Sequence, residues 1–190
     1  MRIAVTGPSG SGKTTLAVEL ARRLGLRHVE IDALHHGPNW ESCGEEVLRE
    51  RVLSATEGDG WVTDSLYHHM LGDLIADRSD LLVWLDLPVP RVMWRLVRRT
   101  YFRKRDQTVL WNGNVEPGWR ESAYYLLWPA LKRALENRRQ FPSRFAHKNL
   151  RRLRSDAEVR AFLQSIQPTS STSGSSSASA LQKTPPVVET

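Results

Sequence analysis

The chain has 190 residues, 40% of them hydrophobic and 25% charged, and no apolar run approaches the roughly 20 residues that cross a bilayer. A single cysteine, Cys43, excludes an internal disulfide, and the N-terminus enters a strand rather than a signal peptide, so we expect a cytoplasmic protein. The net charge of +6 combines an acidic part, residues 1–90 (net −6), with a basic part, residues 91–160 (net +12), which predicts an anionic partner, either a polyphosphate or a nucleic acid.

Strand-like and helix-like periods alternate along the chain. In the first half, we expect strands at 3–6, 28–32, 61–64 and 81–86, and helices at 13–24, 41–57 and 67–78. In the second half, a helix from about 88 to 103, a polar loop at 104–119 and a helix at 120–139 precede a strand at 149–153 and a helix at 156–166. Ser155 or Asp156 is the expected N-cap of this last helix. The alternation predicts an α/β domain over residues 1–166, with a parallel sheet covered by helices on both faces.

Residues 167–190 differ in composition from the rest of the chain. Ser, Thr, Gly and Ala dominate them, and two consecutive prolines follow. Such a segment buries too little apolar surface to offset the entropy of ordering it. We therefore expect a disordered tail.

A glycine-rich loop between the first strand and the first helix fits the pattern G-x-x-x-x-G-K-[ST]. Its glycines allow the backbone N–H groups to turn inward and, with the positive end of the helix, to hold a β-phosphate. The lysine reaches the β- and γ-phosphates of ATP, and the following threonine hydroxyl holds Mg²⁺. A chance glycine-rich turn is the alternative, but the strand–loop–helix context favours the phosphate site. The predicted nucleotide-binding residues are Gly7, Pro8, Ser9, Gly10, Ser11, Gly12, Lys13, Thr14 and Thr15.

This motif resembles that of the P-loop NTPases. The chain contains neither the Asn-Lys-x-Asp segment with which GTPases recognise guanine nor a D-x-x-G segment. Its size is also too small for a motor or transporter subunit. The remaining branch is the small kinases, whose resemblance implies the site residues below.

Two aspartates end predicted strands, where ligands of open α/β sheets bind. The resemblance assigns the magnesium-water role to Asp64, for which a helix N-cap is the alternative, and gives Asp86 a more structural place in a Leu-Asp-x-Pro element. At the end of the second strand, Asp32 matches the acid that activates the acceptor hydroxyl in shikimate- and gluconate-kinase-like enzymes. His35 and His36 are expected to touch the same substrate, although a capping aspartate with two surface histidines is the alternative.

A basic helix is expected before the polar loop. Arg95 and Arg99 lie four residues apart on one face, and adenylate-kinase-like enzymes clamp the transferred phosphoryl group with such a pair. The resemblance implies that a small lid at about 100–120 closes with further arginines, for which Arg103, Arg105 and Arg120 are candidates. A solvated basic face is the alternative reading of these lid arginines.

Over residues 1–166 the chain is similar to the adenylate-kinase-like proteins known as DNA-topology-modulation (FlaR-like) proteins. The resemblance implies a three-layer P-loop fold with a five-stranded parallel sheet of order 2-3-1-4-5. Ser65 stands where relatives usually have glycine, and the Gly-Phe-Pro-Arg segment of true adenylate kinases is missing. The matching segments are the P-loop, Ile31-Asp32-x-Leu34 with Pro38-Asn-Trp40, Gly60-Trp-Val-Thr-Asp64 with Tyr67, Leu85-Asp-Leu-Pro88, Trp111-Asn-Gly-Asn114 and Leu153-Arg-Ser155.

These features predict an ATP- and Mg²⁺-dependent phosphotransferase. Its acceptor is a nucleoside, a sugar acid, another metabolite hydroxyl or a nucleoside monophosphate. Residues 33–60 contain only Arg49 and Arg51, and residues 65–74 contain no arginine, which favours an acceptor without its own phosphate.

Two alternative functions remain. One is a bare ATPase. The other is a nucleotide-regulated nucleic-acid-binding or topology-modulating protein without kinase turnover. The name of the similar family and the basic segment suggest the nucleic-acid-binding protein, because positive charge and stacking aromatic rings bind single-stranded nucleic acids. The rings concerned are Trp94, Tyr101, Phe102, Trp111 and Trp119.

Overall fold

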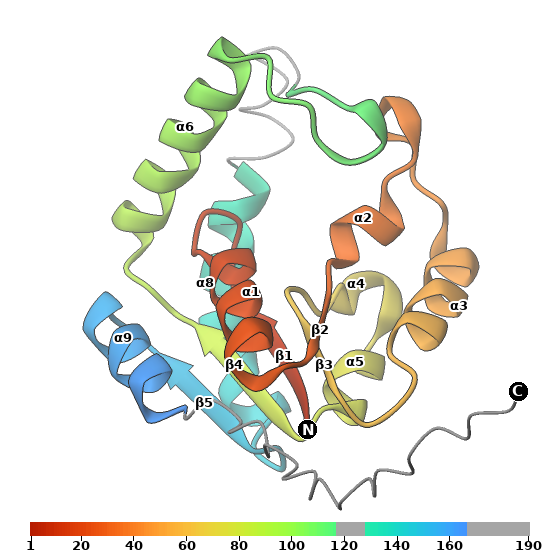
Figure 1. The fold of residues 1–190 in the computed structure, drawn as a ribbon. Coiled ribbons are helices and arrows are strands. Elements are labelled where there is room, and N and C mark those ends of the chain that lie inside the picture. Colours follow the sequence, from red (N-terminus) through yellow and green to blue (C-terminus); the bar gives the residue numbers. More distant parts are fainter. Residues whose placement is uncertain (117–127, 167–190) are drawn as a thin grey trace, which may run out of the picture.

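A computed structural model describes residues 1–116 and 128–166, which form a parallel sheet with helices on both faces (Figure 1). Every neighbouring pair of its strands is parallel, and the spatial order is β2-β3-β1-β4-β5. The predicted fold class and strand order are therefore confirmed. The strands are β1 (Arg2–Thr6), β2 (Arg27–Val29), β3 (Trp61–Thr63), β4 (Leu81–Leu85) and β5 (Leu150–Leu153).

The helices follow the predicted order, with differences in their bounds. Gly25 ends the first helix with a positive φ of 63°, and the Ser155 hydroxyl caps the last one by accepting a hydrogen bond from the Glu158 N–H at 3.1 Å. The described α-helices are α1 (Lys13–Leu24), α2 (Ile31–His35), α3 (Glu45–Ala55), α4 (His68–Leu71), α5 (Leu74–Arg78), α6 (Val89–Arg105), α8 (Trp128–Arg144) and α9 (Asp156–Ser165); two 3-10 turns are η1 (Pro38–Trp40) and η2 (Trp111–Gly113). In the described part of the chain, none of these helices has the length and apolar character to traverse a membrane.

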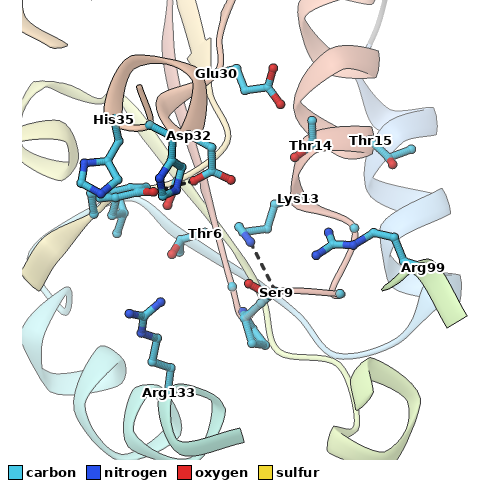
Figure 2. A pocket seen from close by; sticks show the side chains of 18 of the residues that line it. Thr6, Ser9, Lys13, Thr14, Thr15, Glu30, Asp32, His35, Arg99 and Arg133 are labelled. Atoms are coloured by element: carbon cyan, nitrogen blue, oxygen red, sulfur yellow. Dashed lines mark hydrogen bonds between the residues drawn. The ribbon is translucent and has the colours of Figure 1, made fainter. Parts of the chain in front are cut away.

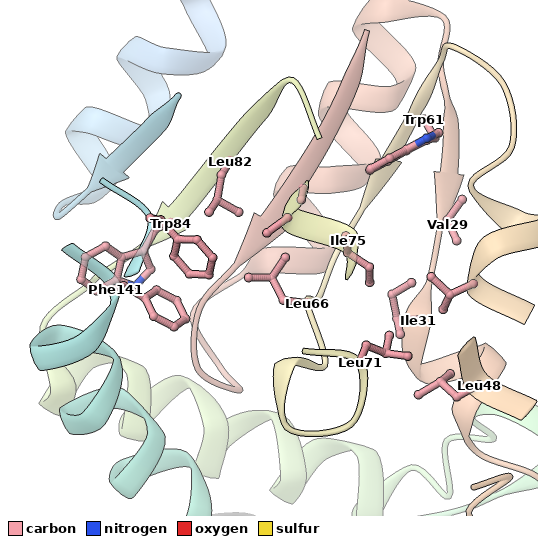
Figure 3. Packing of buried hydrophobic residues seen from close by; sticks show 14 residues of the cluster. Val29, Ile31, Leu48, Trp61, Leu66, Leu71, Ile75, Leu82, Trp84 and Phe141 are labelled. Atoms are coloured by element: carbon pink, nitrogen blue, oxygen red, sulfur yellow. The ribbon is translucent and has the colours of Figure 1, made fainter. Parts of the chain in front are cut away.

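Two apolar clusters fix the sheet between its helices. On one face, Trp61 and Trp84 are fully buried with Phe141 of α8, whose ring centroid lies 5.3 Å from that of Trp84 (Figure 3). On the other face, Leu20 of α1 and Phe162 of α9 cover the central strands. Each fully buried side chain of this size stabilises the fold by about 1.5–3 kcal/mol. The central strands are apolar at nearly every position because both of their faces are covered.

Two predicted elements are wrong in detail. The second strand ends at Val29, so Asp32 lies in the short helix α2 and not at a strand end. The reason is long-range: the Asp64 carboxylate accepts a hydrogen bond from the Ile31 N–H at 3.2 Å and thereby supports a helix start there. The helix expected at 67–78 is divided into α4 and α5 at Gly72, whose φ and ψ of 58° and −133° suit only glycine.

The predicted loop at 104–119 also differs. Helix α6 continues to Arg105, and the segment at 106–116 then crosses to the segment that follows α2, as the bright green and orange ribbons in Figure 1 show. Helix α8 extends to Arg144, beyond the predicted end at 139, because Phe141 belongs to the core. The rest of the proposed lid, with Arg120, lies outside the described residues, as does the predicted tail at 167–190.

Candidate active site

A cavity of about 610 Å³ opens at the carboxyl ends of the central strands. The P-loop and the start of α1 form one wall, and α2 with residues 65–69 forms the opposite wall. Helices α6 and α8 contribute side chains from the second half of the chain. Most of the predicted nucleotide-binding residues line this cavity, namely Gly7, Pro8, Ser9, Gly10, Gly12, Lys13, Thr14 and Thr15, whereas Ser11 is buried in the loop itself.

The loop has the backbone of a phosphate cradle. Gly10 has a φ of 85°, and a Cβ atom there would lie 2.7 Å from the Val92 carbonyl oxygen, so no other residue fits. Helix α1 begins after Gly12 without a side-chain cap, which leaves its first N–H groups available to an anion. The Ser11 hydroxyl is buried and has no hydrogen-bond partner among the described residues. These donors fit a phosphate group.

Lys13 points into the cavity and lies between Asp32 and Arg99 (Figure 2). Its ammonium group donates to the Pro8 carbonyl oxygen at 3.3 Å. Burial lowers the pKa of Lys13, and the negative charges of Asp32 and Asp64 offset part of that effect. An anion beside the ammonium group would therefore be stabilising.

Thr14 and Asp64, the predicted magnesium residues, are in direct contact. The Thr14 hydroxyl donates to a carboxylate oxygen of Asp64 at 2.7 Å, and this carboxylate is almost fully buried. Within residues 1–116 and 128–166, no group of three or more His, Cys, Asp or Glu residues could hold a metal ion. Mg²⁺ needs no such group, since it commonly uses one or two protein oxygens together with substrate phosphates. Thr14 and Asp64 therefore fit Mg²⁺.

Helix α6 presents three arginines to the cavity at intervals of four residues. Arg99 is the most deeply placed: burial and then the charge of Arg103 lower its pKa, and its Nε has no hydrogen-bond partner in the described chain. Arg95 and Arg103 also line the cavity, but Arg95 pairs with Asp156 at 2.9 Å and Arg103 pairs with Glu116 at 3.2 Å. Arg105 is exposed and pairs with Asp106. The roles predicted for these arginines, including Arg120 outside the described residues, stay predictions.

Asp32 faces the P-loop from the opposite wall. One of its carboxylate oxygens accepts a hydrogen bond from the Tyr67 hydroxyl at 2.7 Å. His35 and His36 line the cavity beside it, with their ring centroids 4.6 Å apart. Burial lowers the pKa of both histidines, which favours their neutral forms. Both are therefore suited to hydrogen bonding with a ligand.

The second aspartate that the sequence placed at a strand end has another environment. Asp86 accepts hydrogen bonds from Arg138 of α8 and from Arg152 of β5, each at 2.6 Å in its shortest contact. These ion pairs join the end of β4 to α8 and to β5. The geometry thus separates Asp64, which contacts Thr14, from Asp86, which connects elements of the fold.

Sequence reasoning missed several residues of the cavity. Arg133 and Asn137 lie one helical turn apart on α8, and both line the cavity. Figure 2 shows Arg133 across the cavity from the P-loop. No ion pair involves Arg133 in the part of the chain that the structure describes. Helix periodicity gave no signal for it, because the position of α8 against the sheet depends on Phe141 and Phe145. The other lining residues that were not predicted as site residues are Thr6, Glu30, Trp40, Ser65, Leu66, Tyr67, His68, His69, Trp111 and Glu116.

The sequence is similar to that of a kinase. A cytidylate kinase from Halorubrum lacusprofundi is 36% identical over 116 residues, which cover 52% of this chain and 58% of that protein. The chain thus spans less than two thirds of the length of this relative.

Two solved structures share the fold. The shikimate kinase from Bacteroides thetaiotaomicron superposes with a TM-score of 0.54 at 19% identity, over 87% of this chain and 96% of the other. The M. mycoides deoxyadenosine kinase with bound dATP gives 0.51 at 13% identity, over 87% and 99%. At such identities the likeness shows the fold alone. The family model described as AAA domain matches residues 3–118, more than half of the sequence, and the chain therefore belongs to this family of P-loop proteins.

Proposed function

We propose that the chain is a kinase that uses ATP and Mg²⁺ to phosphorylate a hydroxyl-bearing small molecule. The observation that carries this proposal is the joint presence, in one cavity, of Lys13 and Arg99 beside the P-loop and of the Asp32 carboxylate on the opposite wall. Phosphoryl transfer needs mainly positioning and positive charge around the γ-phosphate, and these residues supply both.

Different residues of the cavity carry out different parts of the reaction. The P-loop N–H groups bind the β-phosphate, while Lys13 and Arg99 stabilise the charge that spreads over the γ-phosphate oxygens. The oxygen of the acceptor hydroxyl bonds to the γ-phosphorus of ATP, and the bond between that phosphorus and ADP breaks. Asp32 takes up the proton that the hydroxyl loses. Mg²⁺ bound next to Thr14 and Asp64 would neutralise phosphate charge.

The acceptor belongs to one of four classes: nucleosides, nucleoside monophosphates, sugar acids and other metabolite alcohols. The sequence argument for an acceptor without a phosphate counted arginines only in residues 33–60 and 65–74. Arg133 of α8 adds a cation to the same cavity, so it offers an anionic group a partner. The name of the similar cytidylate kinase supports an anionic acceptor.

The test is a screen for ADP release from ATP and Mg²⁺ with a panel drawn from these four classes. We expect one class to raise the rate, and Asp32→Asn to lower the stimulated rate by about a hundredfold or more while ATP affinity changes little. Asp77→Asn, an exposed aspartate paired with Lys148, is the matched control. If Asp32→Asn left the acceptor-dependent rate unaltered, the proposed role of Asp32 as the general base would be refuted. ADP release that no acceptor stimulates would indicate an ATPase.

One observation favours a second candidate, a nucleic-acid-binding protein without turnover. The outward face of α6 carries Trp94, which is 67% exposed, together with Arg98 and Arg105 against the ring of Phe102. Exposed basic and aromatic residues on one helix face suit single strands. Salt-titrated binding of single-stranded DNA, with and without ATP, separates the candidates: tight binding that needs no ATP, in a protein without kinase activity, would favour this one.

A further inference from the structure

The Tyr67 hydroxyl group makes one hydrogen bond that core packing does not require. Tyr67 lies between β3 and α4, and its ring packs between His35 and His69, at centroid distances of 4.9 and 5.4 Å. A phenylalanine would make the same ring contacts. The hydroxyl instead reaches across the cavity wall and donates to Asp32 at 2.7 Å.

The backbone at Tyr67 is strained. Its φ and ψ are 45° and 38°, in the left-handed region that bulky residues avoid. Such a conformation costs about 1–3 kcal/mol and persists where the surroundings impose it, often at functional sites. The strained residue is thus the one whose hydroxyl donates to Asp32.

Asp32 has a strong competing partner in the same cavity. Its carboxylate faces the Lys13 ammonium group (Figure 2), and its negative charge acts on the pKa of that group. A direct ion pair between them would occupy both the charge that binds phosphate and the carboxylate that accepts a proton. In the described residues, however, the two form no ion pair: Lys13 donates to Pro8, and Asp32 accepts from Tyr67.

We propose that Tyr67 is a positioning residue that holds the Asp32 carboxylate away from Lys13, so that both charges stay available for substrates. This role rests on the proposed kinase function, in which Lys13 binds ATP and Asp32 faces the acceptor. Burial and the charge of Asp32 raise the pKa of the Tyr67 hydroxyl above its usual value, so the hydroxyl stays protonated and remains a donor at neutral pH. One carboxylate oxygen is thus held by Tyr67, and the other is left for the acceptor.

The test uses ATP with Mg²⁺ as the probe and needs no identified acceptor. Tyr67→Phe keeps the ring and removes the donor, which frees Asp32 to pair with Lys13. We expect calorimetry to show an ATP affinity about threefold to tenfold lower than that of the wild type. In an Asp32→Asn background, the same substitution should leave the affinity unchanged, because no carboxylate remains to compete for Lys13.

The control is a buried hydroxyl that lies away from the cavity. Thr56 is fully buried and donates to the Val52 carbonyl oxygen at 2.7 Å, so Thr56→Val should lower thermal stability and leave ATP affinity intact. Equal losses of affinity from Tyr67→Phe in both backgrounds would mean a purely structural role and would overturn the inference, as would no loss in either. A wild-type protein that fails to bind ATP would instead refute the proposed function.

Discussion

The ammonium group of Lys13 lies where the folded protein itself opposes its charge. Burial lowers its pKa, and Asp32 and Asp64 compensate only in part. Its one hydrogen bond within residues 1–116 and 128–166, to the Pro8 carbonyl oxygen, is long at 3.3 Å. A buried cation without a full partner is costly, and the bound triphosphate would supply the missing negative charge. The charge of Lys13 therefore favours the binding of an anionic ligand and not the stability of the fold.

Lys13→Met should lower ATP affinity by about a hundredfold or more and leave the folded structure intact. Calorimetry would measure the affinity, and circular dichroism would monitor the fold. Because the pKa of Lys13 is lowered, part of the ammonium is neutral at alkaline pH, and an anion restores the charged form. ATP binding should then take up protons at alkaline pH in the wild type. That uptake should disappear in Lys13→Met.

The matched control is Lys132→Met, which removes an exposed lysine that pairs with Glu136 on α8. It should bind ATP with wild-type affinity. Should Lys13→Met retain that affinity as well, the assignment of the P-loop as the ATP cradle would be refuted.

At the scale of elements, residues 110–116 form a clasp with residues 36–41. The buried side chain of Asn114 accepts a hydrogen bond from the Trp40 N–H and donates to the Gly37 carbonyl oxygen, both at 2.9 Å. The Trp40 indole donates to the Val115 carbonyl oxygen at 3.0 Å. Trp40 has a φ of 60°, so these bonds hold a strained residue at the cavity rim. The clasp joins the segment after α6 to the wall that carries Asp32.

Asn114→Ala should release this clasp. The loss of two hydrogen bonds to the backbone should cost about 1–3 kcal/mol of unfolding free energy, measured by denaturant titration. Hydrogen exchange should become faster at the Trp40 amide. Asn112→Ala, which removes one bond to the His36 carbonyl oxygen, should have a smaller effect. Unchanged exchange at residues 36–41 in Asn114→Ala would contradict the clasp.

The sequence predicted the features that depend on neighbouring residues and missed those that depend on distant ones. Apolar periods and glycine positions predicted the strands and α1 because these features depend on neighbours in the chain. The α2 helix depends on a hydrogen bond to Asp64, 33 residues away, and the cavity position of Arg133 depends on how α8 packs against the sheet. The P-loop and Asp32 were found by motif and resemblance, whereas Arg133 was missed. Such long-range contacts leave no local pattern.

At the scale of the whole molecule, the acidic and the basic parts of the chain both contribute side chains to the lining of one cavity. The acidic first half contributes the P-loop and Asp32 to the lining, with Asp64 bonded to the lining residue Thr14, and the basic second half contributes Arg99 and Arg133. Ion pairs consume part of the basic excess, as at Arg95, while Arg99 and Arg133 form no ion pair in residues 1–116 and 128–166. The fold thus concentrates uncompensated positive charge where a triphosphate and an anionic acceptor would meet.

The same view predicts that the active part of the chain ends at residue 166. Phe162 of α9 is buried in the core, Ile166 packs against the same cluster, and Asp156 holds Arg95. A chain of residues 1–166 should therefore unfold within about 2 °C of the full chain and bind ATP equally well, as thermal melting and calorimetry would show. Removal of α9 as well, in a chain of residues 1–154, should destabilise the fold strongly because Phe162 leaves a cavity in the core. A loss of ATP affinity in the 1–166 chain would mean that residues 167–190 contribute to the nucleotide site, against their interpretation as a tail.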